Sequence, residues 1–273
     1  MLRLLYRVLR FWHLLSLDAP TVAALWCWAF GRAARVRLAP WLPIALALGT
    51  WLFYVADRLL DARLSPPSAL RERHCFHYWH RRAFLAVAAP VALALAALVA
   101  QMPRSLIAAY SVLGVLSLLY LGLVHLPLPL RRIALHSFPK EFAVALLFAA
   151  ATALPAWDAA SRHAAGMSPS HALLFLCPVF AALCWLNCLA IEDWEQHRSG
   201  FRIPLLALCT LAGCAFTIPA VASSMARELA AAALLSAALF LLLDHSRMAA
   251  SGRRIAADLV LLTPLLLIAA RLA

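Results

Sequence analysis

The chain has 273 residues, of which 65% are hydrophobic and 13% are charged, and its formal net charge is +12. A water-soluble domain is about half apolar and a quarter charged, so this composition excludes a soluble globule and predicts a protein that uses lipid as part of its solvent. The positive charge does not indicate a nucleic-acid partner, because the basic residues gather in loops between apolar runs, where they suit anionic lipid headgroups.

The apolar runs are long and do not alternate with a period of two, which excludes a β-barrel and leaves helices. We therefore predict an all-α polytopic membrane bundle that forms a single transmembrane domain over residues 1–273 and crosses the bilayer about nine times. The spans are expected near residues 14–33, 40–61, 83–102, 105–124, 139–157, 170–191, 203–222, 226–244 and 255–272.

Flanking segments and charges predict how the spans are oriented. Residues 1–13 are basic and apolar and lack a small-residue cleavage site, which favours an amphipathic segment over a removed signal peptide. Residues 62–82 form a basic loop after the second span. Most of the 24 Lys and Arg residues fall in the N-terminus and in the loops after even-numbered spans. The positive-inside rule then places those parts in the cytoplasm and the C-terminus outside, in an inner or plasma membrane.

Prolines and cysteines add two structural expectations. Pro90, Pro178 and Pro264 lie inside spans and are expected to kink them. The seven cysteines include no CxxC pair and lie mostly in apolar runs, which favours small buried side chains over disulfides.

The end of the second span carries the first candidate site. Asp57 and Asp61 are four residues apart, so both carboxylates share one helix face. Paired carboxylates suit Mg²⁺ that also binds substrate phosphates, and the neighbouring Arg58 and Arg63 would hold the same phosphates. The alternative is a pair of interfacial acids bridged to Arg58 and to arginines of the loop.

A second acidic cluster, Glu192, Asp193 and Glu195, ends the sixth span on the same predicted side. Asn187 shares a helix face with Glu195, so both would point into one cavity. The alternative is a helix–helix hydrogen bond for Asn187 and solvated acids at the helix end. Two acidic clusters that face one vestibule are typical of a divalent-cation site.

These pieces resemble the UbiA superfamily of intramembrane prenyltransferases. Asp57, Arg58 and Asp61 match the DRxxD part of its first Asp-rich motif, whereas Phe53 and Tyr54 stand where the family has Asn and Asp. Further similar pieces, in the family's order, are Asp18-Ala-Pro20 with Trp26, Arg131-Arg132, Pro139-Lys140-Glu141 and the acids after the sixth span.

The resemblance implies a nine-helix UbiA-like fold and an isoprenyl transfer from a diphosphate donor to an aromatic or lipid acceptor. Loss of diphosphate would leave an allylic carbocation, which the acceptor captures. The implied catalytic residues are Asp57, Asp61, Asn187 and Glu195. The implied Mg²⁺ ligands are Asp57, Asp61, Glu192, Asp193 and Glu195. The implied diphosphate-binding residues are Arg58, Arg63, Arg132, Lys140 and Arg198.

Two other functions fit the same scaffold. One is a catalytically divergent relative that binds or transports lipid, which the altered residues Phe53 and Tyr54 favour. The other is a membrane terpene cyclase, in which the substrate's own double bond is the acceptor. The aromatic residues Trp51, Phe53, Tyr54 and Trp185 would line the chamber and face the cation, or would simply pack or anchor the helices at the interface.

The loop after the second span also carries His74, His77 and His80 beside Cys75. A transition-metal site is one interpretation, but a spacing of three drifts round a helix. The segment is alternatively a basic, aromatic stretch at the headgroups, or a lid that lends His or Arg to the phosphate at Asp57 and Asp61.

Overall fold

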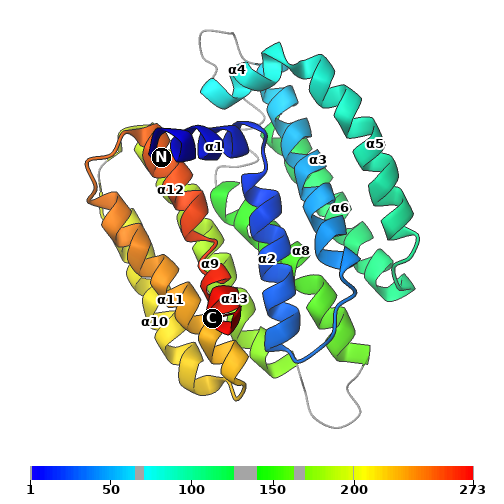
Figure 1. Cartoon of the computed structure of the whole chain (residues 1–273), viewed down its shortest axis with the longest axis vertical. Coiled ribbons are helices and arrows are strands. Elements are labelled where there is room, and N and C mark those ends of the chain that lie inside the picture. Colours follow the sequence, from blue (N-terminus) through cyan, green and yellow to red (C-terminus); the bar gives the residue numbers. More distant parts are fainter. Residues whose placement is uncertain (1, 65–70, 126–139, 163–169, 199, 273) are drawn as a thin grey trace. The chain divides into compact units, whose positions relative to one another are not determined.

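The computed structural model describes residues 2–64, 71–125, 140–162, 170–198 and 200–272 of the chain (Figure 1). Every regular element in these ranges is a helix, which confirms the predicted all-α class. All seven cysteines are free thiols, as their spacing predicted.

The chain divides into two compact units, which we describe separately. The N-terminal unit comprises Met1–Ala23 and Pro40–Lys140, and the C-terminal unit comprises Ala24–Ala39 and Glu141–Ala273. Helix α2 (Asp18–Ala33) contributes to both units. The other helices of the N-terminal unit are α1 (Leu2–Leu14), α3 (Trp41–Leu64), α4 (Glu72–Trp79), α5 (Arg81–Val99) and α6 (Arg104–Val124). Those of the C-terminal unit are α8 (Lys140–Arg162), α9 (Ser170–Glu195), α10 (Arg202–Ala220), α11 (Ser224–Asp244), α12 (Ala250–Val260) and α13 (Leu265–Leu272).

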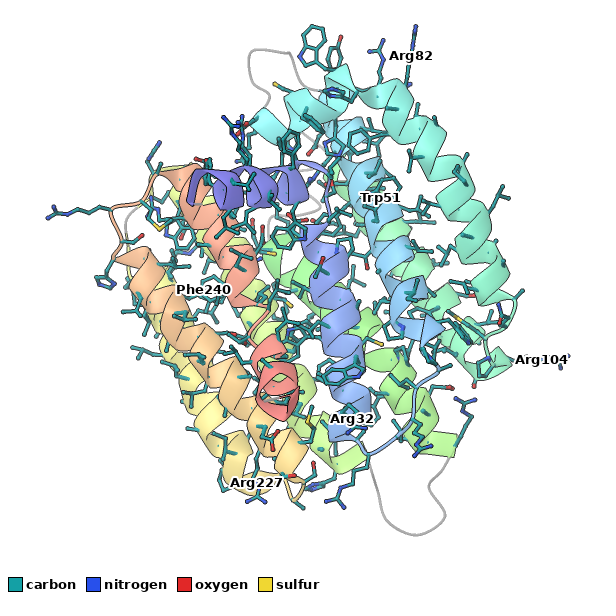
Figure 2. The ribbon with its side chains drawn as sticks, in the orientation of Figure 1. Arg32, Trp51, Arg82, Arg104, Arg227 and Phe240 are labelled. Carbon is teal, nitrogen blue, oxygen red and sulfur yellow. The ribbon has the colours of Figure 1, made fainter. Side chains whose placement is uncertain are left out.

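Seven helices among the described residues are long and apolar enough to cross a membrane, which indicates an integral membrane protein. They are α3, α5, α6, α8, α9, α10 and α11, and they correspond to the second to eighth predicted spans. Large apolar side chains such as Leu93 and Leu118 on α5 and α6 are exposed, as lipid-facing side chains would be. Figure 2 shows Arg82 and Arg104 projecting outward from the first residues of these two helices.

The last predicted span is not a continuous helix, and the helix of the first, α2, begins at Asp18 rather than near residue 14. Helices α1 and α2 meet at an angle of 86°, with Ser16 in the left-handed region at φ 58° between them. The last predicted span is divided into α12 and α13, and the break at residues 261–264 ends on Pro264, where a backbone donor is missing. If the bent pair is one span, the described chain has up to eight, so the nine-span count stays a prediction.

The break between α12 and α13 exposes backbone carbonyls that the protein must satisfy, because lipid offers them no hydrogen bond. The indole N–H of the fully buried Trp26 donates to the Leu261 carbonyl at 2.8 Å. The hydroxyl of Ser236 on α11 lies 2.8 Å from the Val260 carbonyl, and Thr263 donates to the Ala232 carbonyl at 2.9 Å. The broken helix is therefore held by side chains from α2 and α11.

Replacing Trp26 with Phe tests this account of the break. The variant keeps a ring to stack on Phe180, whose centroid lies 4.2 Å away, but leaves the Leu261 carbonyl without its donor. We expect a loss of about 1–3 kcal/mol, seen as a lower thermal midpoint of the purified protein. The matched control is Trp12→Phe, which removes a 3.2 Å bond to Thr21 at an exposed position and should cost little. Equal losses in the two variants would contradict this role of Trp26.

Candidate functional site

The two carboxylates at the end of α3 lie on one helix face, as their spacing of four predicts. The side chains of Asp57 and Asp61 are each 37% exposed, so solvent or a ligand can reach them. Both approach the same neighbour, the imidazole of His125, which follows the last residue of α6. The predicted first acidic motif is therefore a partly open pair of carboxylates against a ring from a second helix of the N-terminal unit.

His125 is held in a defined orientation. Its Nδ1–H donates to the Leu121 carbonyl at 2.8 Å, and its side chain is 10% exposed. Its Nε2 lies 3.2 Å from Oδ1 of Asp61 and 3.9 Å from Oδ1 of Asp57. One ligand atom from each residue lies within 4.8 Å of the other two, which is a spacing that a metal ion can bridge. We name these three residues the Asp57–Asp61–His125 cluster.

Sequence reasoning missed His125. It is a lone histidine one residue beyond the predicted fourth span, and it belongs to no motif. A signal was nevertheless present, because the charge count placed the ends of the second and fourth spans on the same side of the membrane. Asp61 and His125, each able to bind a metal, stand at these two ends, so a contact between them could have been predicted.

His74 borders the cluster from α4. Its Nε2 lies 3.5 Å from Oδ2 of Asp61 and accepts a hydrogen bond from Nε of Arg73 at 3.1 Å. Burial, reinforced by the cations Arg73 and Arg58, lowers the pKa of His74 to about 3, so the ring is neutral at physiological pH. Of the predicted histidine triplet, His77 and His80 make other contacts, described below.

Arg58 lies between the two aspartates in sequence but faces a different environment. Its side chain is 4% exposed, and it donates to Ser16 Oγ at 2.6 Å and to the His13 carbonyl at 3.3 Å. It also lies 3.9 Å from the carboxylate of Asp18, which is 2.7 Å from the His13 ring. Arg58 thus ties α3 to the turn between α1 and α2, and its predicted contact with diphosphate stays a prediction.

His77 and His80 complete the description of α4, which occupies part of the predicted 62–82 loop. His77 is fully buried, stacks on Phe84 with centroids 4.0 Å apart, and lies 3.1 Å from Ser16 Oγ. His80 is exposed and lies against Phe76. The three histidines therefore do not converge on one point, and only His74 approaches an aspartate of the cluster.

The burial of His77 predicts an acid-dependent stability. Burial lowers its pKa from 6.5 to about 4, although a hydrogen bond to the Arg73 carbonyl opposes part of the shift. Above pH 6.5 the ring is neutral in both folded and unfolded chains, and between 6.5 and 4 only the unfolded chain gains the proton. We expect stability to fall as the pH drops through this window, and His77→Gln, which cannot titrate, to lose less than the wild type.

The measurement is the thermal midpoint of both proteins at pH 7.5 and pH 5. His80→Gln, at the residue that follows α4, is the control, because it replaces an exposed histidine instead of the buried one. The interpretation fails if the wild type and His77→Gln lose the same number of degrees.

Two of the three carboxylates of the second acidic cluster, at the end of α9, have arginine partners. Asp193 accepts a hydrogen bond from Arg202 at 3.2 Å, and Glu195 accepts one from Arg254 of α12. Glu192 accepts one from Gln196. The described groups that are close enough to share a cation include none of these three acids. Within the C-terminal unit, arginine therefore neutralises Asp193 and Glu195.

Asn187 lies deeper on α9, where its amide donates to Oδ1 of Asp258 on α12 at 3.3 Å. Asp258 is buried, with 8% of its surface exposed. The amide oxygen of Asn187 is buried and has no hydrogen-bond partner among the described residues. This interhelical bond is the alternative that the sequence left open for Asn187.

The other predicted diphosphate-binding residues are distributed over the chain. Arg63 is exposed at the end of α3, and Lys140 is exposed at the first residue of α8. Arg198 lies 3.9 Å from Asp193, and Arg132 lies outside the described residues. Because Asp57 and Asp61 belong to the N-terminal unit and residues 187–195 to the C-terminal unit, a shared vestibule stays a prediction.

Comparison with known proteins returned no family model, no curated protein and no solved structure that matches this chain.

Proposed function

We propose that this chain is an integral membrane prenyltransferase that moves an isoprenyl group from a diphosphate donor to an aromatic or lipid acceptor. The observation that carries the proposal is the Asp57–Asp61–His125 cluster, a partly exposed set of cation ligands at the end of a membrane-length helix. A donor with an apolar tail and a charged head needs this combination of an apolar bundle and a polar site at its edge.

The residues of the cluster suit a divalent cation, because two carboxylates supply the oxygen ligands that Mg²⁺ and related ions prefer. When bound, the cation would neutralise the charge that develops on the departing diphosphate. Asp57 and Asp61 hold the cation site, and the exposed Arg63 near the end of α3 would contact the diphosphate. The surrounding apolar helices exclude water from the carbocation.

In the proposed orientation the N-terminus and the loops after even-numbered spans face the cytoplasm. The diphosphate donor would then arrive from the cytoplasm, and the acceptor from the lipid phase of an inner or plasma membrane.

A second candidate is a divergent relative that binds or transports a lipid without transfer. The arginine partners of Asp193 and Glu195 favour it, because carboxylates neutralised by arginine are less available to a second cation. It retains the apolar bundle and predicts no release of diphosphate.

The test is incubation of the purified protein with a panel of isoprenyl diphosphates and divalent cations, with and without an aromatic acceptor, while diphosphate release is measured. Release that depends on a cation and on an acceptor supports the transferase. Release without an acceptor, giving a cyclic hydrocarbon or alcohol, indicates the cyclase. No release with any donor contradicts both enzymes and leaves the lipid-binding relative.

A further inference from the structure

The orientation of His125 determines which of its ring nitrogens faces the two aspartates. A carbonyl oxygen only accepts hydrogen bonds, so the 2.8 Å bond to Leu121 requires a proton on Nδ1. In the neutral ring, Nε2 then carries the lone pair. That lone pair faces Oδ1 of Asp61 at 3.2 Å and Oδ1 of Asp57 at 3.9 Å. Three electron-rich atoms converge, and a positive charge between them would satisfy all three.

A second histidine shows that helix capping does not produce this convergence. His245 follows the last residue of α11 as His125 follows that of α6, and its Nδ1 lies 2.8 Å from the Leu241 carbonyl. The ring of His245 is exposed. The bond to the preceding turn is therefore a shared local geometry, whereas the approach to two carboxylates is particular to His125.

We propose that the Asp57–Asp61–His125 cluster is a site for a divalent transition-metal ion, in which Nε2 of His125 is a ligand that selects Zn²⁺ or Co²⁺ over Mg²⁺. Imidazole suits ions of this class, whereas Mg²⁺ prefers oxygen ligands and water. The cluster supplies one nitrogen and two oxygens, and three protein ligands leave a position open for a water molecule or a phosphate oxygen.

The separations fit such a site. Two ligands about 2.0–2.1 Å from a tetrahedral ion are about 3.3 Å apart. The distance from Nε2 to Asp61 already has this value, and the distance to Asp57 needs only a small adjustment of a partly exposed carboxylate. The bond from Nδ1 to Leu121 is the outer contact that commonly orients a metal-binding histidine. The inference deepens the proposed function, because it names the ion of the same site.

The experiment measures binding of the ions themselves. Full-length protein, purified through a tag without histidine and stripped with EDTA, is titrated with Co²⁺ and separately with Mg²⁺ in detergent. Bound metal is measured by equilibrium dialysis, and the visible absorption of Co²⁺, compared between the wild type and His125→Ala, reports whether His125 changes the coordination of the ion. We expect His125→Ala to lower the Co²⁺ affinity at least about tenfold and the Mg²⁺ affinity less than about threefold.

His245→Ala is the matched control, because it removes the same capping bond without touching the cluster, and it should bind both ions as the wild type does. His125→Asp is the second variant, which turns the site into three carboxylates and should raise the ratio of Mg²⁺ to Co²⁺ affinity. A misfolded protein would not show that gain.

The proposal is overturned if His125→Ala binds Co²⁺ as tightly as the wild type, or if the wild type prefers Mg²⁺. Failure of the wild type to bind either ion would overturn it as well, and would mean that a proton rather than a metal lies between His125 and Asp61. Diphosphate release separates this inference from the proposed function. Co²⁺ bound through His125 without any release would contradict the function alone. Release whose dependence on the Co²⁺ concentration is the same in the wild type and in His125→Ala would contradict the inference alone.

Discussion

Asp57→Asn and Asp61→Asn are each expected to reduce diphosphate release by about 100-fold or more, because each removes a charged ligand of the proposed cation. Asn has nearly the same shape as Asp but carries no charge, so it cannot help to hold a divalent ion beside a diphosphate. Asp61 is the closer of the two to His125 and also approaches His74, so its loss should be at least as severe.

The loss must come from chemistry and not from unfolding. Because both carboxylates are 37% exposed, the two variants should unfold within a few degrees of the wild type. Asp244→Asn is the matched control, since its amide oxygen can still accept the 2.8 Å hydrogen bond from Trp194 in the C-terminal unit. Transfer that persists in both Asp57→Asn and Asp61→Asn, at the rate of the control, would exclude a cation-dependent transferase at this site.

Arg58→Met is expected to destabilise the protein by about 3–5 kcal/mol, because the buried carboxylate of Asp18 loses one of its two basic partners. Methionine roughly preserves the length of the side chain but supplies no donor to Ser16 or to the His13 carbonyl. Asp18, with a side chain only 6% exposed, would keep His13 but lose the guanidinium. The thermal midpoint, or the yield of monodisperse protein where the variant fails to accumulate, measures the effect.

Arg63→Met separates the structural role of Arg58 from a role in binding substrate. Arg63 is exposed five residues further along α3, so its loss should leave the thermal midpoint unchanged while raising the KM for the diphosphate donor. If Arg58→Met instead folds normally and changes only the KM, Arg58 acts mainly on the substrate, as the motif alone suggests.

Hydrophobicity and charge along the chain were sufficient to predict the helices. Seven apolar runs became seven membrane-length helices, because in hydrocarbon each backbone must satisfy its own hydrogen bonds within the segment. The same argument was less accurate at the first and last predicted spans. A hydropathy sum does not register the turn at Ser16 or the break at residues 261–264, where Trp51 donates to the Leu15 carbonyl and Trp26 to the Leu261 carbonyl.

For the site, the sequence by itself determined that Asp57 and Asp61 share a helix face, because that follows from 3.6 residues per turn. It did not determine their partners. Only the tertiary structure brought His125 to them from more than 60 residues away and turned Arg58 inward to Ser16. Local periodicity is set by the backbone of one helix, whereas the neighbours of a side chain depend on how helices pack, and that depends on contacts between residues far apart in the chain.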